Sequence, residues 1–272
     1  MSERATSKDF VVSNAFPGSI TYQLIVREIE SRYRGSVLGV LWSFLTPLFM
    51  LAIFTFVFAV VFRARWGGST ETSLTEYALI LFAGLTAFSL FSEVFGRAPM
   101  LVTSQPNLVK KVVFPLHVLA VVALGSALFQ AGISFAVLIA FQVTIGSGFH
   151  WPTLLVPFLI VPLCLFTLGV AWFLSSLGVY VRDVGQIIPP VVTALMFLSP
   201  IFYPVTALPE WIRPVASYSP IAYSVETVRD AMIFGRLPEV VSYLVALAGG
   251  LAVAGLGFAF FQKTRKGFAD VL

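Results

Sequence analysis

Residues 112–181 form an uninterrupted run of 70 residues without Asp, Glu, Lys or Arg. A helix crosses the hydrocarbon core of a bilayer with about 20 apolar residues, so this run is long enough for two crossings. The GSGFHWP segment at 146–152 places a turn signal with aromatic interface anchors in its middle. In the whole chain 58% of residues are hydrophobic and 11% are charged, whereas soluble domains carry about 25% charged residues. The sequence therefore predicts a polytopic membrane protein and excludes an ordinary water-soluble globule.

The apolar segments are typical of helices. A transmembrane β-strand alternates between polar and apolar residues, whereas residues 37–62 are apolar at nearly every position. We expect one all-α integral membrane domain over residues 1–272. Its six predicted spans are 36–62, 74–96, 115–145, 153–181, 187–206 and 239–262.

Three segments between and before these spans are too polar or too broken to cross. Residues 19–34 have apolar side chains on one helical face and charges on the rest, as in an amphipathic interface helix. Residues 97–114 form a basic loop with a short helix. Residues 207–238 carry prolines every few positions, which favours two short re-entrant helices at one membrane face.

The distribution of basic residues predicts the orientation. Six spans place both termini on one side of the membrane, and twelve Lys and Arg residues then fall on that side against five on the other. The positive-inside rule makes that side cytoplasmic.

Several classes of chemistry have no residues to support them. None of the five lysines follows a glycine, so the phosphate-binding G-x-x-x-x-G-K-[ST] loop is missing. Cys164 is the single cysteine, and His117 and His150 are far apart in the sequence, so no metal site is expected. Glu76 and Glu93 lie near span ends, where snorkelling to the interface is the expected role.

Five motifs follow one another along the chain. They are RYRGSVLGVLW at the first span, QPNLVKKVVFP after the second, VYVRDV after the fourth, LSPIFYP in the fifth and SPIAYSVETVRD before the sixth. In this order and spacing the chain resembles, from about residue 20 to 268, the membrane (permease) subunit of type-2 ATP-binding-cassette (ABC) exporters. More narrowly, it is similar to permeases that export lipid-linked O-antigen, capsular polysaccharide or teichoic acid.

This resemblance implies a homodimeric permease of the bacterial inner membrane that works with two copies of a cytoplasmic ABC ATPase chain. That partner would bind ATP and Mg, while this chain would be no enzyme and hold no cofactor. The implied substrate is a polyprenyl-linked glycan such as an O-antigen or capsule-like polysaccharide, and no nucleic acid is expected as a partner.

In that family the loop after the second span is a coupling helix that sits in a cleft of the ATPase. The residues at this position here are Asn107, Leu108, Lys110 and Lys111. Charge alone leaves other roles open for the two lysines, because an ordinary cytoplasmic loop and a site for anionic membrane lipids have the same composition.

Arg27, Arg32 and Arg34 of the interface helix are candidates for binding a lipid diphosphate or a headgroup. The planar guanidinium fork matches phosphate oxygens. The helix can serve as an anchor and coupling element alone, or it can also recruit the lipid-linked substrate.

Aromatic residues are candidates for the substrate channel, because ring faces can contact sugar C–H groups without gripping one sugar. Trp42, Phe49 and Phe56 recur every seven residues on one face of the first span, and Phe202 and Tyr203 follow Pro200. Helix packing produces the same seven-residue stripe, so both interpretations stay open.

The resemblance also implies that the segment beyond the fifth span forms gate helices at the outer mouth, and the gate candidates there are Trp211, Tyr218, Tyr223, Glu226 and Arg229. Glu226 and Arg229 are spaced i, i+3 and can pair on one helical face. A structural ion pair is favoured over direct contact with the polymer.

Two other functions remain open at this point. One is an ABC-2 permease for a small lipid or drug. The other is an integral membrane transferase that acts on a lipid phosphate, which would need clustered Asp, Glu or His residues. Asp183, next to Arg182, is the only acidic residue in a short cytoplasmic loop between spans, which disfavours the transferase.

Overall fold

The computed structural model describes residues 17–61, 66, 74–110, 114–146, 148–213 and 218–272, and over these ranges the regular structure is helical without strands. The longer helices are α1 (Pro17–Tyr33), α2 (Trp42–Phe54), α3 (Leu74–Arg97), α6 (Val118–Ile145), α8 (Val161–Tyr180), α9 (Val184–Leu198), α11 (Pro220–Met232) and α12 (Val240–Thr264). The shorter elements are η1 (Gly39–Leu41), the π-helical η2 (Thr55–Val61), α4 (Met100–Thr103), α5 (Pro106–Lys110), η4 (Trp151–Leu155), α7 (Val156–Leu159), η5 (Val205–Ala207), η6 (Arg265–Gly267) and α13 (Phe268–Val271).

Five stretches of the described chain are long and apolar enough to cross a membrane. They are Gly39–Val57, Thr75–Arg97, Val118–Thr144, Trp151–Tyr180 and Val240–Val271, and they correspond to predicted spans one to four and six. The fifth predicted span appears as α9, which is apolar but has only 15 residues. At 1.5 Å per residue it is about 22 Å long, against a hydrocarbon core of about 30 Å. A sixth crossing therefore stays a prediction.

Helix α9 ends at Leu198, eight residues before the expected end of the span at 206. The next residue, Ser199, has extended backbone with ψ of 144°, because a residue that precedes proline is disfavoured in the helical region. The segment from Pro200 to Pro204 is therefore a true break between α9 and η5 rather than a kink within one helix.

The predicted pair of short helices over 207–238 is described in part. Helix α11 occupies its second half. The first half, up to Arg213, consists mostly of turns after η5, and residues 214–217 lie outside the described residues.

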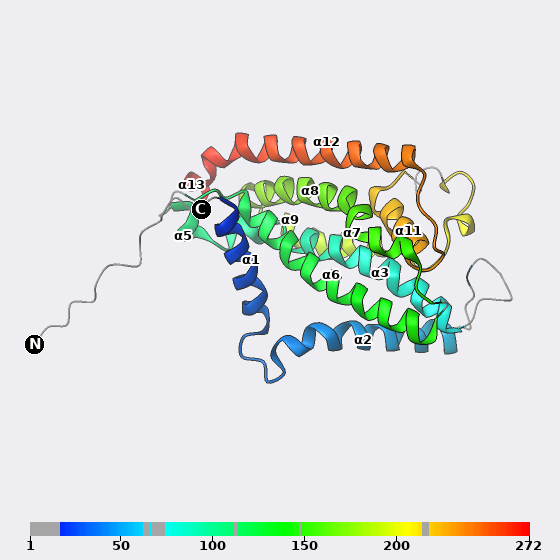
Figure 1. Ribbon diagram of the computed structural model, residues 1–272. Coiled ribbons are helices and arrows are strands. Elements are labelled where there is room, and N and C mark those ends of the chain that lie inside the picture. The colour runs from blue at the N-terminus through cyan, green and yellow to red at the C-terminus, as the bar shows by residue number, and fades with distance from the viewer. Residues whose placement is uncertain (1–16, 62–65, 67–73, 111–113, 147, 214–217) are drawn as a thin grey trace, which may run out of the picture.

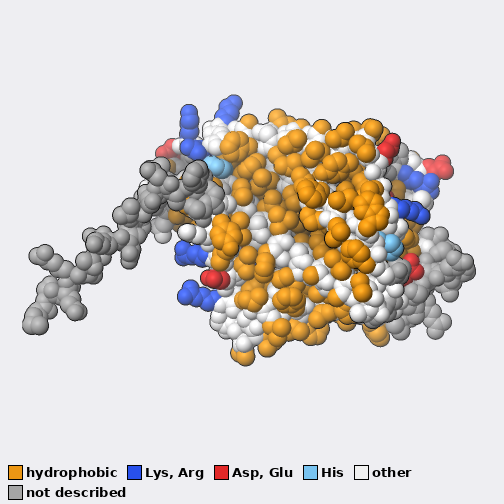
Figure 2. All heavy atoms as spheres, viewed as in Figure 1, with side chains coloured by type: hydrophobic (Ala, Val, Ile, Leu, Met, Phe, Trp, Pro, Cys, Tyr) orange, Lys and Arg blue, Asp and Glu red, His pale blue; other side chains and the backbone are white. Residues whose placement is uncertain are grey.

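Helix α3 lies in the middle of the bundle, with α2 along one side and α12 along the opposite side (Figure 1). In the apolar window of α3, 72% of the residues are buried, whereas the windows of the first and last spans are 17% and 22% buried. Figure 2 shows a broad apolar surface between two ends that carry the charged side chains. The exposed faces of α2 and α12 are thus suited to lipid or to another apolar surface.

Glycines bring α8 and α12 into backbone contact. A Cβ on Gly257 of α12 would overlap the backbone carbonyl of Gly169 on α8, and a Cβ on Gly250 would lie 2.7 Å from the carbonyl oxygen of Pro162. Small residues of this kind let membrane helices pack closely, since apolar burial gives no driving force between helices in lipid.

Two glycines turn the chain from α1 into α2. Gly35 and Gly39 have φ of 84° and 51°, a left-handed conformation that favours glycine. Gln130 of α6 holds this turn, because its Oε1 accepts a hydrogen bond from Tyr33 Oη at 2.9 Å and its Nε2 donates to the Ser43 carbonyl at 2.9 Å. Helix α1 is thereby fixed across one end of the bundle (Figure 1).

Candidate functional site

The end of the bundle that carries α4, α5 and α13, here named the α5 end, begins where α3 stops at Arg97. Pro99 and Pro106 cannot continue a helix, so each starts a new one, at the N-cap of α4 and the first position of α5. Asn107 and Lys110 are exposed, and Leu108 is half-buried against the core. Lys111, the fourth predicted coupling residue, lies outside the described residues.

The C-terminal helix α13 packs next to α5. Helix α13 contacts both α5 and α8. Its first residue, Phe268, is fully buried and packs edge-on against Phe261, with ring centroids 5.5 Å apart, and against Tyr180 at 6.0 Å. Tyr180 Oη in turn donates a hydrogen bond to the Thr264 carbonyl at 2.7 Å. Helix α5 therefore packs on α13, which is itself held against α8 and α12.

Four charged residues join α1 to α3. Arg32 pairs with Glu93, and Arg97 pairs with Glu28. Arg97 also lies 3.8 Å from Glu93, and Arg32 Nη2 donates to Ser126 Oγ of α6 at 2.8 Å. We call Glu28, Arg32, Glu93 and Arg97 the α1–α3 charge cluster. With Ser31 they line a hollow of about 400 Å³ at the α5 end.

The three arginines that were predicted to bind phosphate differ in their partners, because only Arg32 belongs to this cluster. The Arg32 guanidinium is committed to an ion pair, whereas Arg27 and Arg34 are exposed. The pairing of Glu28, Glu93 and Arg97 was not predicted from the sequence. The i, i+4 spacing of Glu28 with Arg32, and of Glu93 with Arg97, was an available signal, but the cross-helix partners are 61 and 69 residues apart.

The predicted channel aromatics fall into two groups. Trp42, Phe49 and Phe56 are 40%, 57% and 61% exposed, so all three lie on the open side of α2 and of η2, which directly follows it. Phe202 is half-buried, and its ring centroid lies 6.3 Å from that of Phe54 on α2 and 5.7 Å from that of Phe197 on α9. Phe202 thus connects α2 to the end of α9.

Tyr203, beside Phe202, binds the end of α9. Its hydroxyl donates to the Phe197 carbonyl at 2.8 Å and lies 3.3 Å from the Leu198 carbonyl. Carbonyls in the last turn of a helix have no partner within the helix, so Tyr203 satisfies two of them.

Arg229 of α11 is the most deeply buried charge among the described residues, with 2% exposure. It donates hydrogen bonds to the carbonyls of Ile201 at 3.0 Å, Pro200 at 3.2 Å and Ile80 at 3.4 Å. The predicted pairing with Glu226 is present, at 3.9 Å. Burial lowers the pKa of Arg229 to about 10, so the side chain is still charged at neutral pH. The i, i+3 pair was visible in the sequence, whereas the backbone contacts were not.

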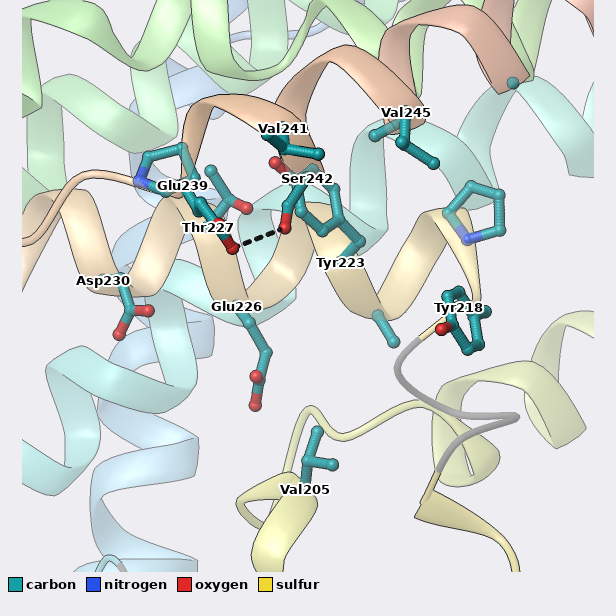
Figure 3. Close-up of a pocket in the computed structure, with 15 residues that line it drawn as sticks. Val205, Tyr218, Tyr223, Glu226, Thr227, Asp230, Glu239, Val241, Ser242 and Val245 are labelled. Atoms are coloured by element: carbon teal, nitrogen blue, oxygen red, sulfur yellow. Dashed lines mark hydrogen bonds between the residues drawn. The ribbon is translucent and has the colours of Figure 1, made fainter.

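A pocket of about 640 Å³ opens between α11, the start of α12 and η5 (Figure 3). Three of the predicted gate residues line it, namely Tyr218, Tyr223 and Glu226. The other polar residues of its wall are Thr227, Asp230, Glu239 and Ser242. Figure 3 shows Glu226 pointing from α11 toward Val205, and Ser242 donating to Glu239 at 3.4 Å. The fifth gate candidate, Trp211, is 79% exposed and does not line this pocket.

The pocket has few groups that attract an anion. Its charged lining residues are the carboxylates Glu226, Asp230 and Glu239, and the guanidinium of the adjacent Arg229 is directed into the core. Carboxylates accept hydrogen bonds and tyrosine rings offer apolar faces, so the wall is chemically suited to groups that bring hydroxyl donors. Among the described residues, no group of three or more His, Cys, Asp or Glu side chains has an arrangement that could hold a metal ion.

Comparison with known proteins gives consistent matches over most of the chain. Residues 20–233 match the model of the ABC-2 type transporter family. The chain is 26% identical over 249 residues to the O-antigen export system permease protein RfbA of Myxococcus xanthus, which covers 91% of this chain and 93% of that protein.

Two further relatives have similar coverage. The chain is 27% identical to an O-antigen export system permease protein RfbA of Klebsiella pneumoniae, over 90% of this chain and 92% of that protein. It is 23% identical to the polysialic acid transport protein KpsM of Escherichia coli, over 89% and 92%. With the family model matching well over half of its length, and with several apolar helices able to cross a bilayer, the chain belongs to the ABC-2 type transporter family of multi-pass membrane permeases.

Proposed function

We propose that this permease is the membrane subunit of an ATP-driven exporter that moves a polyprenyl-linked polysaccharide across the bacterial inner membrane. In this proposal two copies of the chain form the pathway, and two copies of a separate cytoplasmic ATPase supply ATP binding and hydrolysis. The similarity to O-antigen and polysialic acid permeases over about nine-tenths of the chain supports the polysaccharide class of substrate.

The observation that carries the coupling part of the proposal is the placement of α5. The most buried span, α3, leads through α4 into this short helix, which exposes Asn107 and Lys110 at a charged end of the bundle. A partner that pushes on α5 would act directly on α3. The α5 end is cytoplasmic in this proposal, and the α11 end, formed by η5 and α11, is extracytoplasmic.

The α1–α3 charge cluster extends this connection to α1. Because Arg32 and Glu28 bind Glu93 and Arg97 near the end of α3, α1 moves with α3 and α5 as one unit. Helix α1 leads through the turn at Gly35 into α2 and η2, which expose Trp42, Phe49 and Phe56. Motion at α5 would therefore shift a face that offers aromatic rings to the polymer.

Arg27 of α1 and Arg34, which directly follows α1, take the phosphate role in this scheme. Both are exposed, and neither belongs to the α1–α3 charge cluster. Exposed guanidinium groups are free to approach phosphate oxygens. Arg32 is instead assigned to the charge cluster. We propose that Arg27 and Arg34 bind lipid headgroups or the substrate diphosphate near the cytoplasmic entrance.

The test is transport in proteoliposomes that contain this chain and its partner ATPase. The variant Lys110→Glu/Lys111→Glu should lose co-purification of the ATPase and ATP-driven movement of a radiolabelled lipid-linked glycan. The matched control Lys263→Glu reverses an exposed charge at the end of α12 and should keep both activities. Full transport by the double variant would refute the coupling role. Transport of a short lipid but of no lipid-linked glycan would refute the polysaccharide substrate.

A further inference from the structure

The break after α9 leaves backbone carbonyls that a side chain from another helix must satisfy. Pro200 and Ile201 belong to no helix, and both are buried, Ile201 with 0% exposure. Buried carbonyls without a donor are costly in a region that excludes water. Arg229 supplies that donor from α11, with Nη2 3.2 Å from the Pro200 oxygen and 3.0 Å from the Ile201 oxygen.

The same guanidinium also reaches α3. Its Nε lies 3.4 Å from the Ile80 carbonyl oxygen. One turn further along, Gly84 leaves the room that the side chain needs, since a Cβ at that position would lie 2.7 Å from Arg229 Nη2. Tyr77, on the same helix, donates its hydroxyl to the Phe202 carbonyl at 3.1 Å. Helix α3 therefore contacts the break directly, through Tyr77, and also contacts Arg229.

An aromatic ring from the segment between α2 and α3 also packs against the Arg229 guanidinium. The Trp66 ring lies over the guanidinium, with Arg229 Cζ 4.3 Å from the ring centroid, and its centroid is 6.1 Å from that of Tyr77. A cation over an indole face is attracted by the ring quadrupole, most strongly where water is excluded. Arg229 thus contacts three separate parts of the chain at the α11 end, namely the break after α9, helix α3 and Trp66.

The neighbouring carboxylate is not the main partner of this charge. Arg229 Nη1 lies 3.9 Å from Glu226 Oε1 and makes no hydrogen bond to the described residues. Glu226 instead points into the pocket between α11 and η5 (Figure 3). The charge is held mostly by backbone oxygens and an aromatic ring, and the hydrogen bonds to the Pro200 and Ile201 oxygens break when α9 moves away from α11.

We infer that Arg229 is a positioning residue that latches the broken outer end of α9 to α3 and α11 and so keeps the extracytoplasmic mouth closed in the absence of ATP. That the α11 end is the extracytoplasmic mouth of the pathway rests on the proposed function. The latch itself is a property of this chain alone. Release of Arg229 from the carbonyls of Pro200 and Ile201 would free the segment that carries Phe202 and Tyr203.

The latch is tested first without partner or substrate. In a Cys164→Ser background, Ile201→Cys places a thiol at a fully buried position of the segment that Arg229 holds, without changing the backbone carbonyl. A membrane-impermeant maleimide should label it slowly. Adding Arg229→Gln should speed labelling at least about tenfold, since local opening controls access to a buried group. Arg229→Lys, which keeps the charge but loses the planar fork, should give an intermediate rate.

A second cysteine separates local release from general unfolding. Met232→Cys lies on the same helix and replaces a side chain with 0% exposure. Its labelling should stay slow in the Arg229→Gln variant. Equal labelling rates at 201 with and without Arg229 would overturn the latch, and so would a parallel rise at 201 and 232, because that result indicates unfolding.

Gly84→Ala provides an independent route to the same state, because the added methyl group displaces the guanidinium while leaving Arg229 in place. It should speed labelling at 201, whereas the control Gly96→Ala should not, since a Cβ at Gly96 of α3 meets nothing within 4 Å. No change with Gly84→Ala would contradict the assigned packing.

The gate role is then tested in proteoliposomes with the ATPase but without nucleotide. Arg229→Gln should release a trapped fluorescent oligosaccharide, whereas the parent and Gly96→Ala should retain it. Faster labelling at 201 without leakage would overturn the gate role. Failure of the proposed function would appear in the Lys110→Glu/Lys111→Glu transport experiment and would leave the labelling result unchanged.

Discussion

The ion pair between Arg32 and Glu93 should couple α1 to α3 by a measurable free energy. Two unit charges about 4 Å apart attract by about 1 kcal/mol in water and about 4 kcal/mol at an effective dielectric constant of about 20. The two side chains are 29% and 25% exposed, so their environment lies between these limits. Exposed pairs contribute only about 0.2–1 kcal/mol, because water screens them and ordering two long side chains costs entropy. We therefore expect a coupling free energy of about 1–2 kcal/mol.

The measurement is a double-mutant cycle of Arg32→Ala, Glu93→Ala and the double variant. Reversible unfolding in mixed micelles, followed by tryptophan fluorescence, gives the free energy of unfolding of each variant. The double variant should be less destabilised than the sum of the single variants by the coupling free energy. A control cycle of Lys263→Ala with Glu93→Ala should give a coupling close to zero, because residues that are not in contact behave additively.

Charge inversion then tests the functional role of the cluster. Arg32→Glu alone places three carboxylates together and should reduce ATP-driven transport as well as stability. Inverting all four charges of the α1–α3 charge cluster keeps every pairing. This fourfold variant should therefore regain most of the transport that Arg32→Glu loses. A coupling free energy near zero, or loss of transport in the fourfold inversion equal to that of Arg32→Glu, would refute the reasoning that α1 moves with α3 through these pairs.

Two further predictions concern packing and the turn into α2. In detergent, Gly257→Leu should strongly lower the midpoint temperature of thermal unfolding, because the leucine side chain would overlap the Gly169 backbone. The control Gly255→Leu should have a small effect, since a Cβ at Gly255 meets nothing within 4 Å. A similar midpoint for the two variants would contradict the α8–α12 contact. Gln130→Leu removes the bridge from Tyr33 to the Ser43 carbonyl, and should cost about 1–3 kcal/mol in unfolding free energy by leaving buried polar groups unsatisfied. An unchanged free energy of unfolding would show that the turn is held without it.

The sequence by itself determined the helical membrane class, the approximate places of most helices and the resemblance to ABC-2 exporters. These properties depend on local length and composition. A run of 70 uncharged residues must be divided into helices, and the turn signal at 146–152 falls where α6 ends and η4 begins. The expected span over 187–206 contains Pro200 and Pro204, where a kink is predicted because the missing N–H acts within a few residues; the helix in fact ends just before them, at Leu198.

Only the tertiary structure decided which polar residues meet. Glu93 was expected to snorkel toward the interface, yet it pairs with Arg32 from a helix 61 residues earlier. Arg229 was expected to pair with Glu226, yet its closest partners are carbonyls of the α9 break, in space left by Gly84. Cross-helix contacts of this kind depend on the rotation and depth of each helix. Packing of the whole bundle sets both, and no local pattern in the sequence encodes them.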